Sequence, residues 1–285
     1  MNQKYKVGVI GTGVMGKGLA QILSTAEVVE QVFWCSGRES TITKQHEDLI
    51  NLIGRQVKKG KLPDNAYDMA LSKLTIIHSF QPLAECDFVH EAVSENVEIK
   101  HSVFKRLHFL QTAKPIISTC SSSISITELA RSILYPERFL GMHFFNPVAT
   151  MRLVEIIRGY HTDIETEEKA KSYANALGKT PIEVSDSPGF IVNRMLIPMI
   201  NEAVCILADN VADRDSIDGA MKLGANHPIG PLALSDLIGN DVVLSIMEVL
   251  YNETGDQKYR PHPYLKKMVR AGMLGKKTGR GFYDY

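Results

Sequence analysis

Short apolar runs alternate with amphipathic stretches over the first two thirds of the chain. Runs rich in β-branched and aromatic residues predict strands at 6–11, 31–35, 74–78, 87–93, 115–119, 139–144, 153–158 and 181–184. Helical patterns are expected at 14–23 and 40–59. Strands that alternate with helices form a mostly parallel sheet with helices on both faces. The pattern therefore predicts a doubly wound α/β domain.

One helix of this domain carries signals for both of its ends. The stretch HTDIETEE, residues 161–168, opens a helical pattern after the strand at 153–158. Thr162 and Glu165 have the spacing of a capping box. Gly178 fits the left-handed residue that follows many helices. We therefore expect a helix that begins just after Thr162 and ends just before Gly178.

The pattern changes near residues 185–189, after which only helices are predicted. Ser187 and Pro188 have the order of an N-cap followed by proline at the first helical position. Helical patterns then cover 190–210, 213–223, 232–251 and 262–271, and Pro198 is expected to kink the first of them. Their broad apolar coverage indicates burial on more than one face, against either a partner subunit or the first domain. The expected domains are 1–186 and 187–285.

Charge and composition exclude several classes of protein. The 32 basic residues balance the 32 acidic ones, so bulk attraction to nucleic acid or a membrane surface is not indicated. No apolar run reaches the ~20 residues that span a bilayer, and the N-terminus lacks the pattern of a signal peptide. The four cysteines show neither a CxxC pair nor metal-ligand spacing, so we expect no metal site. Scattered cysteines favour reduced thiols in the cytoplasm.

A glycine-rich turn follows the first predicted strand. The stretch GTGVMG, residues 11–16, contains the GxGxxG spacing and lies between that strand and a helix. Gly11 permits the tight turn, Gly13 lets the backbone approach a pyrophosphate, and Gly16 allows the helix to pack closely on the strand. The N–H groups at the start of the helix attract the anion. The residues at 1–186 therefore predict a dinucleotide-binding domain of the Rossmann type.

A second stretch, FLGMHFFNPVATMRLVEIIRG at 139–159, contains two predicted strands joined by a loop. His143 lies in the first strand and Glu155 in the second, and a hairpin-like return would bring them together. A carboxylate next to an imidazole orients the ring and favours its protonated form, so the ring can exchange a proton near neutral pH. A single histidine in an apolar strand is more often a core residue than a catalyst. The residues alone favour that simpler interpretation.

Long blocks of sequence resemble the short-chain L-3-hydroxyacyl-CoA dehydrogenases, especially the bacterial members that act on four-carbon acyl groups. The resemblance covers nearly the whole chain. The blocks that carry it include VGVIGTGVMGKGLAQ, SSSISITELA, GMHFFNPVATMRLVEIIRG, DSPGFIVNRMLIPMINEAV, AMKLGANHPIGPLALSDLIG, TGDQKYRPHPYLKKMVRAG and KKTGRGFYDY. The resemblance implies a dehydrogenase that uses a nicotinamide cofactor. It also implies that residues 187–285 bind the substrate and form a homodimer.

The resemblance implies a role for each of four residues. His143 would accept the proton of the 3-hydroxyl group during oxidation, or donate it during reduction. Glu155 would hold and polarise His143, and Ser122 would hydrogen-bond the reacting oxygen. Asn193 would position the substrate from the second domain, which places the predicted site in a cleft between the domains. Taken one by one, Ser122 suits a local turn and Asn193 suits a helix surface.

The residues around Ser122 depart from the family pattern. The family has Asn-Thr-Ser-Ser where this chain has Cys-Ser-Ser-Ser at 120–123. The catalytic serine position is kept, but Cys120 replaces a neutral amide that could bond the cofactor or the backbone. We expect activity to be retained with a reshaped nicotinamide pocket. A nucleophilic role for Cys120 is disfavoured because no base is paired with it.

Coenzyme A carries several phosphate charges, so a neutral protein needs a local basic patch to bind it. Lys58, Lys59 and Lys61 form such a cluster after the second predicted helix, and the resemblance places CoA contacts there together with Ser122. The alternative is an exposed helix end at which lysines are favoured by the helix dipole. Single lysine contacts with exposed phosphates contribute little because solvent screens them.

The end of the second predicted strand lacks the acidic residue that usually binds the adenosine ribose. Cys35 occupies about that position, and Ser36, Gly37 and Arg38 follow it. Ser36 and Arg38 are suited to bind a 2′-phosphate, which favours NADP(H), with NAD(H) as the alternative. The arginine instead faces solvent if Glu39 serves as the displaced acid. The residues expected to contact the cofactor are Gly11, Gly13, Val14, Met15, Gly16, Ser36, Arg38, Glu91, Asn96 and Asn146.

Three functions compete for this sequence. The resemblance favours a cytoplasmic enzyme that interconverts acetoacetyl-CoA and (S)-3-hydroxybutyryl-CoA, in either butyrate formation or fatty-acid breakdown. A related β-hydroxyacid dehydrogenase would act on a free acid, but such enzymes usually use a catalytic lysine. A catalytically silent relative would bind the cofactor without turnover, and the presence of His143, Glu155, Ser122 and Asn193 argues against it.

Overall fold

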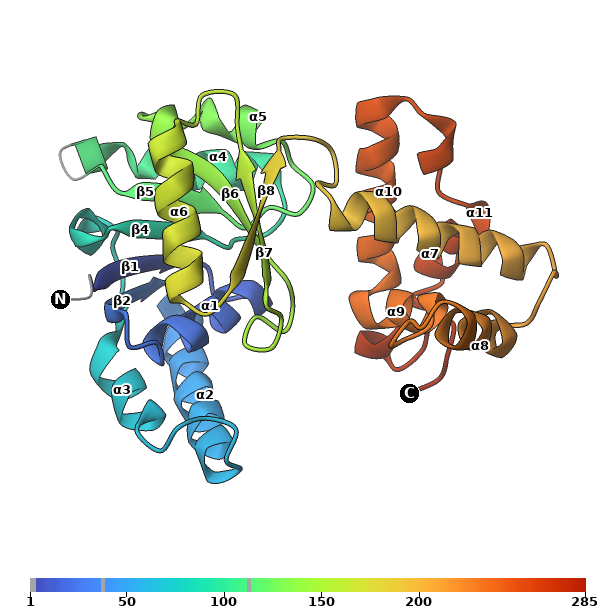
Figure 1. Ribbon diagram of the computed structural model, residues 1–285, viewed down its shortest axis with the longest axis horizontal. Coiled ribbons are helices and arrows are strands. Elements are labelled where there is room, and N and C mark those ends of the chain that lie inside the picture. The colour runs from blue at the N-terminus through green and yellow to red at the C-terminus, as the bar shows by residue number, and fades with distance from the viewer. Residues whose placement is uncertain (1–3, 37–38, 112–113) are drawn as a thin grey trace. The chain divides into compact units, whose positions relative to one another are not determined.

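The computed structural model describes residues 4–36, 39–111 and 114–285. The chain divides into two compact units, Met1–Asp186 and Ser187–Tyr285. The first unit is a sheet with helices on its faces and the second is built from helices (Figure 1). Each unit has its own hydrophobic core.

Eight strands of the first unit form one sheet in the order β3-β2-β1-β4-β5-β6-β7-β8. Neighbouring strands are parallel, except that β6 and β7 are antiparallel. The order 3-2-1-4-5-6 is that of a Rossmann domain, so the predicted fold class is confirmed. The strands are β1 Tyr5–Ile10, β2 Val29–Cys35, β3 Leu74–Ile77, β4 Phe88–Glu91, β5 Ile116–Thr119, β6 Phe139–Phe144, β7 Leu153–Arg158 and β8 Thr180–Ser185.

The helices of the first unit bury apolar side chains against this sheet. Residues of α1, α2, α3 and α6 share one core with the strands, and it includes the fully buried Trp34 and Tyr173. Phe104 of α4 packs edge-on against Phe139 of β6, with ring centroids 5.2 Å apart. The helices are α1 Val14–Ser24, α2 Glu39–Lys58, α3 Ala66–Lys73, α4 Val97–Arg106, α5 Ile126–Ala130 and α6 Ile164–Ala176.

The predicted capping box of α6 is wrong at its first residue. The N-cap is Asp163, whose carboxylate accepts a hydrogen bond of 2.7 Å from the backbone N–H of Thr166. The hydroxyl of Thr162 is instead buried: it donates to the carbonyl of Phe139 and accepts from the N–H of Gly159. Gly178 does follow the helix in the left-handed conformation, with φ +73°.

The second unit contains α7 Val192–Ala208, α8 Arg214–Gly224, α9 Pro231–Ile238, α10 Asn240–Thr254 and α11 Pro263–Arg270. Its first helix begins later than the sequence predicts. Ser187 and Pro188 lie in a turn, where the Ser187 hydroxyl accepts a hydrogen bond from Arg194. Among the described residues, no helix combines the length and the apolar character needed to cross a membrane.

One predicted helix, at 232–251, is two helices in the structure. Gly239 separates α9 from α10 with a φ of +105°, which no residue of a right-handed helix adopts. The carboxylate of Asp236, in α9, accepts hydrogen bonds from Asn240 and from the N–H groups of Phe282 and Tyr283. Asp236, which lies just before the break, therefore fixes the C-terminal segment to the helical unit.

Candidate active site

The carboxyl ends of the parallel strands place the glycine turn after β1 and a serine-rich turn after β5 in the same sheet edge as His143 near the end of β6. Loops at this edge are where ligands bind in open α/β sheets. The glycine turn, the serine turn and His143 therefore lie at one edge of the sheet. Their individual contacts determine what that site can do.

The glycine turn has the shape that a dinucleotide requires. Gly11 has a φ of +123°, and a Cβ there would collide with the backbone of Ala92. A Cβ at Gly16 would collide with the carbonyl of Gly11, whereas the space in front of the exposed Gly13 is open. No side chain caps the start of α1, and its first turn holds no acidic residue. Its N–H groups are therefore suited to a pyrophosphate.

Trp34 of β2 supports the glycine turn through a hydrogen bond. The indole N–H of the fully buried Trp34 donates a 2.8 Å hydrogen bond to the carbonyl of Gly11. The backbone N–H of Gly11 donates in turn to the carbonyl of Cys35. Strand β2 thus holds the first glycine by contacts on both sides of the residue. Val14 is exposed beside the turn, and Met15 packs partly into the core.

Cys35 ends β2, at about the position where a ribose-binding carboxylate is usual. The side chain of Cys35 is 1% exposed, and its thiol contacts the carbonyl of Val9. Burial raises the pKa of this thiol to about 12. Ser36 is half-buried and its hydroxyl accepts a 3.4 Å hydrogen bond from Thr12 of the glycine turn. Arg38 lies outside the described residues, so its predicted phosphate contact stays a prediction.

His143 and Glu155 are directly opposite each other in the antiparallel pair β6 and β7. The imidazole Nδ1 lies 2.6 Å from the carboxylate Oε2, and both side chains are buried. A carboxylate only accepts hydrogen bonds, so Nδ1 carries the proton and donates it to Glu155. The ring of Phe145 packs on the imidazole at 4.5 Å between centroids. The ring orientation is therefore fixed by the sheet.

Ser122 faces the other ring nitrogen of His143. Its hydroxyl oxygen lies 3.1 Å from Nε2. With Nδ1 protonated, the neutral ring presents Nε2 as an acceptor, and the hydroxyl donates to it. The result is a chain of hydrogen bonds from Ser122 through His143 to Glu155. Such a chain can take up or release a proton at Nε2.

Glu95 is a site residue that the sequence did not reveal. Its Oε1 accepts from the N–H groups of Ser122 at 2.8 Å and Ser123 at 3.0 Å, and from the hydroxyl of Ser121 at 2.7 Å. Burial works to raise the pKa of Glu95, but the charge of Lys100 and the serine hydrogen bonds lower it below its ordinary value. An ionised Glu95 thus organises the turn that carries Ser122. Its only sequence signal is a carboxylate near the end of a strand.

Two predicted cofactor residues are bonded to protein groups. The fully buried Glu91 accepts two hydrogen bonds of 2.9 Å from Lys100, one from the Thr119 hydroxyl and one from the N–H of Val93. Asn96 caps α4 by accepting from the N–H of Ile99. Glu91 therefore braces the ends of β4 and β5. Direct cofactor contacts of both residues stay predictions.

The loop between β6 and β7 carries Asn146, which is exposed. Lys179 holds this loop: its buried ammonium group donates to the carbonyls of Val148 and of Met151, the latter at 2.9 Å. Burial lowers the pKa of Lys179. The loop that returns the chain from His143 to Glu155 is thereby fixed at its far end.

The remaining predicted residues lie as follows. Lys58 ends α2, and Lys59 and Lys61 follow it, all three exposed. Asn193 lies in the first turn of α7 in the second unit, where it is buried. Cys120 is buried, and burial together with the charge of Glu91 raises the pKa of its thiol, which disfavours a nucleophilic role. Substrate contacts of the lysines and Asn193 stay predictions.

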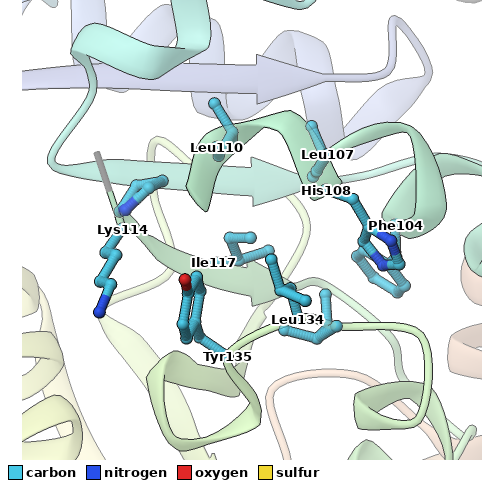
Figure 2. A pocket seen from close by; sticks show the side chains of 10 residues that line it. Phe104, Leu107, His108, Leu110, Lys114, Ile117, Leu134 and Tyr135 are labelled. Carbon is cyan, nitrogen blue, oxygen red and sulfur yellow. The ribbon is translucent and has the colours of Figure 1, made fainter. Parts of the chain in front are cut away.

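A small apolar cavity lies away from these residues, beside the start of β5 (Figure 2). Its volume is about 20 Å³, room for about one water molecule. The Lys114 ammonium lies 4.5 Å from the centre of the Tyr135 ring at its rim. The Ser122 turn follows the opposite end of β5. The cavity is therefore too small and too remote to hold the substrate.

Comparisons with known proteins cover the whole chain. Residues 6–187 match the family model "3-hydroxyacyl-CoA dehydrogenase, NAD binding domain", and residues 189–285 match "3-hydroxyacyl-CoA dehydrogenase, C-terminal domain". The 3-hydroxybutyryl-CoA dehydrogenase of Clostridioides difficile is 48% identical over 280 residues, covering 98% of this chain and 99% of that protein. A probable 3-hydroxybutyryl-CoA dehydrogenase of Deinococcus radiodurans is 45% identical over 288 residues, covering 98% and 100%. The crystal structure of (S)-3-hydroxybutyryl-CoA dehydrogenase from Ralstonia eutropha superposes with a TM-score of 0.92 at 44% identity, covering 98% of each chain.

Proposed function

The chain belongs to the 3-hydroxyacyl-CoA dehydrogenase family, and on that premise we propose that it interconverts acetoacetyl-CoA and (S)-3-hydroxybutyryl-CoA. It is an oxidoreductase whose first unit is a NAD-binding domain, so its cofactor is a nicotinamide dinucleotide. The substrate is proposed because relatives 45–48% identical over nearly the full chain are named for it. The observation that carries the chemistry is His143 held between Glu155 and Ser122.

His143 works as the acid and base of this reaction. During oxidation its Nε2 accepts the proton of the 3-hydroxyl group, and Glu155 stabilises the imidazolium that forms. During reduction the imidazolium returns that proton to the carbonyl oxygen. Ser122 hydrogen-bonds the reacting oxygen beside Nε2. The turn at Gly11–Gly16 would hold the pyrophosphate of the nicotinamide dinucleotide, which would supply or accept the hydride when bound.

The other predicted contacts place the substrate around these groups. Lys58, Lys59 and Lys61 are exposed at the end of α2 and bind the phosphates of coenzyme A. Asn193 positions the acyl group from the second unit. The family supports this assignment more than the exposure of the lysines does, because exposed lysines at a helix end are common. Replacing all three lysines by alanine is therefore expected to raise KM with little change in kcat.

A spectrophotometric assay tests the proposed function. The purified chain is mixed with acetoacetyl-CoA, and oxidation of the reduced nicotinamide is followed by its absorbance. Free acetoacetate at the same concentration is the comparison. Turnover with the CoA ester and not with the free acid is expected. The opposite preference would identify a free-acid dehydrogenase, and cofactor binding without turnover of acyl-CoAs would identify a silent relative.

We further propose that NADP(H) is preferred over NAD(H). The support is that β2 ends in a buried thiol where a ribose-binding carboxylate is usual, followed by Ser36 and Arg38. Arg38→Ala removes a cation suited to the 2′-phosphate. The KM for NADPH is expected to rise about tenfold, with little change for NADH. Equal effects on the two cofactors, measured with acetoacetyl-CoA, would remove Arg38 from the cofactor preference.

We also propose that the helical unit forms a homodimer in the cytoplasm. The support is a set of large apolar side chains exposed on the second unit. These residues are Met195, Val211, Leu223 and Leu237. Light scattering coupled to size-exclusion chromatography is expected to give twice the mass of one chain.

A further inference from the structure

We propose that Asp186 is a positioning residue for Ser122, a role that rests on the proposed function. Asp186 is the last residue of the first unit and directly follows β8. Ser122 lies in the serine segment, residues 121–127. The carboxylate of Asp186 holds the C-terminal end of this segment. It accepts hydrogen bonds from residues 125–127, which lie three to five positions after Ser122. Its influence on the reaction therefore passes through the serine segment.

The contacts of Asp186 are close and numerous. Oδ2 accepts a 2.7 Å hydrogen bond from the Ser125 hydroxyl and another of 2.7 Å from the N–H of Thr127, and Oδ1 accepts one of 3.1 Å from the N–H of Ile126. These donors lie 59 to 61 positions earlier in the sequence. The contact is therefore tertiary. It ties the end of β8 to the start of α5.

Helix α5 does not need this carboxylate as a cap. Ser125 is already its N-cap, because the Ser125 hydroxyl accepts from the N–H of Glu128 while it donates to Asp186. A helix of only five residues thus has a local cap and a distant one. Asp163 provides the contrast, since it caps the thirteen-residue α6 alone. The contact between Asp186 and the start of α5 is therefore explained by the preceding residues, which carry Ser122.

The serine segment is held at both ends. Glu95 binds Ser121, Ser122 and Ser123 at the start, as described above, and Asp186 binds the three residues at 125–127. Between them, the Ser121 hydroxyl accepts from the N–H of Ile124 at 3.0 Å, which closes the turn. Ser122 lies in this short bridge, with its hydroxyl 3.1 Å from Nε2 of His143.

A segment fixed at one end only would let Ser122 shift relative to the imidazole. A displacement of about 1 Å in a catalytic group costs on the order of 10²-fold in rate. Loss of Asp186 should therefore lower kcat. The binding of the dinucleotide at the glycine turn should be spared, because Asp186 contacts none of the residues of that turn in the described interactions.

The test compares Asp186→Ala and Asp186→Asn with Asp163→Ala in the full-length enzyme. Asp163→Ala removes a capping carboxylate from the same unit without touching the serine segment, so it is the matched control. Asp186→Ala is expected to lower kcat for acetoacetyl-CoA about 10-fold to 100-fold. Asp186→Asn keeps one acceptor oxygen and should fall between. The Kd of NADH, measured by calorimetry, and the kcat of Asp163→Ala should stay within about twofold of the wild type.

A double-mutant cycle separates positioning from general loss of stability. If Asp186 acts through Ser122, adding Asp186→Ala to Ser122→Ala should lower kcat by less than about threefold further. Multiplying losses would overturn the proposal. Asp186→Asn replaces the alanine variant in the cycle if the latter fails to fold.

Hydrogen exchange keeps this inference separate from the proposed function. The amides at 122–127 should exchange faster in Asp186→Asn than in the wild type, without any substrate present. Unchanged exchange would overturn the positioning role even if acetoacetyl-CoA is turned over. Failure of the wild type to turn over acetoacetyl-CoA would instead overturn the proposed function alone.

Discussion

Among its described residues, the first unit contains two buried histidines, each hydrogen-bonded at both ring nitrogens, and they differ in their partners. His90 of β4 is 0% exposed, with Nδ1 2.7 Å from the Ser118 hydroxyl and Nε2 3.0 Å from the Tyr173 hydroxyl. His143 of β6 is 5% exposed, with a serine hydroxyl at Nε2 and the carboxylate of Glu155 at Nδ1. A serine contact and burial are therefore common to both.

The carboxylate and the location distinguish His143, the proposed acid and base, from His90, a core residue. The His90 ring is stacked in an aromatic cluster with Phe88 and Tyr173, and burial lowers its pKa to about 3. It stays neutral at physiological pH, and its ring is fully buried. Nδ1 of His143 instead faces the Glu155 carboxylate, and its serine partner lies in a half-buried turn at the carboxyl edge of the sheet. The two rings therefore differ in the partner at one nitrogen, and the proposed role of His143 depends on that carboxylate.

The largest effect on activity is expected from His143→Gln, which tests whether His143 differs from His90 in function. Without a base at Nε2, kcat is expected to fall about 10³-fold, within the range that general acid–base catalysis supplies. Steady-state assays with acetoacetyl-CoA and circular dichroism measure the two quantities. A folded variant whose kcat stays within tenfold of the wild type would exclude His143 from proton transfer.

Glu155→Gln tests the carboxylate alone. The amide keeps an oxygen near Nδ1 but removes the charge that stabilises the imidazolium, so kcat should fall on the order of 10²-fold. Glu167→Gln is the matched control, because Glu167 is also buried in the first unit and pairs with Arg158 rather than a histidine. The comparison fails if both variants, assayed under the same conditions, lose the same activity.

His90→Gln is expected to change stability and leave kcat nearly untouched. The folded pKa of His90, about 3, lies below its ordinary value of 6.5, so below pH 6.5 the unfolded chain binds the extra proton. The free energy of unfolding therefore falls with falling pH, by up to about 1.4 kcal/mol per pH unit from this group. Urea unfolding of His90→Gln between pH 7 and 4 should show a shallower dependence and lower stability at pH 7.

Ser118→Ala is the control for that experiment. It removes one hydrogen bond, at a cost of about 1–3 kcal/mol, while the imidazole stays buried. The pH dependence of its stability should remain as steep as that of the wild type. A flattened dependence in Ser118→Ala, or an unchanged one in His90→Gln, would show that another group causes the acid sensitivity.

The sequence predicts the fold well because strand periodicity is a local property. The two histidines show where such reasoning ends. FVHEA around His90 and GMHFF around His143 are alike in pattern, and only tertiary pairing gives one ring a carboxylate. Glu95 and Asp186 were missed for the same reason. Their partners lie tens of residues away, so the sequence does not reveal these contacts.

The predicted helix boundaries were wrong where a tertiary contact competed with a local signal. Thr162 has the spacing of a cap, but its hydroxyl is used by the carbonyl of Phe139, and Asp163 takes over. The apolar positions at 232–251 continue on both sides of Gly239, so the pattern does not reveal that this residue adopts a positive φ. In both cases the local pattern was compatible with two structures, and contacts from distant parts of the chain decided between them.

The hydrogen bond from Trp34 to Gly11 gives the protein an optical probe of its own. Trp34 is the sole tryptophan of the chain, so intrinsic indole emission has one source, directly beneath the glycine turn. Movement of that turn on ligand binding changes the polarity around the indole and hence its emission wavelength. Reduced nicotinamide also absorbs where indole emits, so energy transfer quenches the signal. Cofactor titrations therefore need no label, and Trp34→Phe supplies the blank.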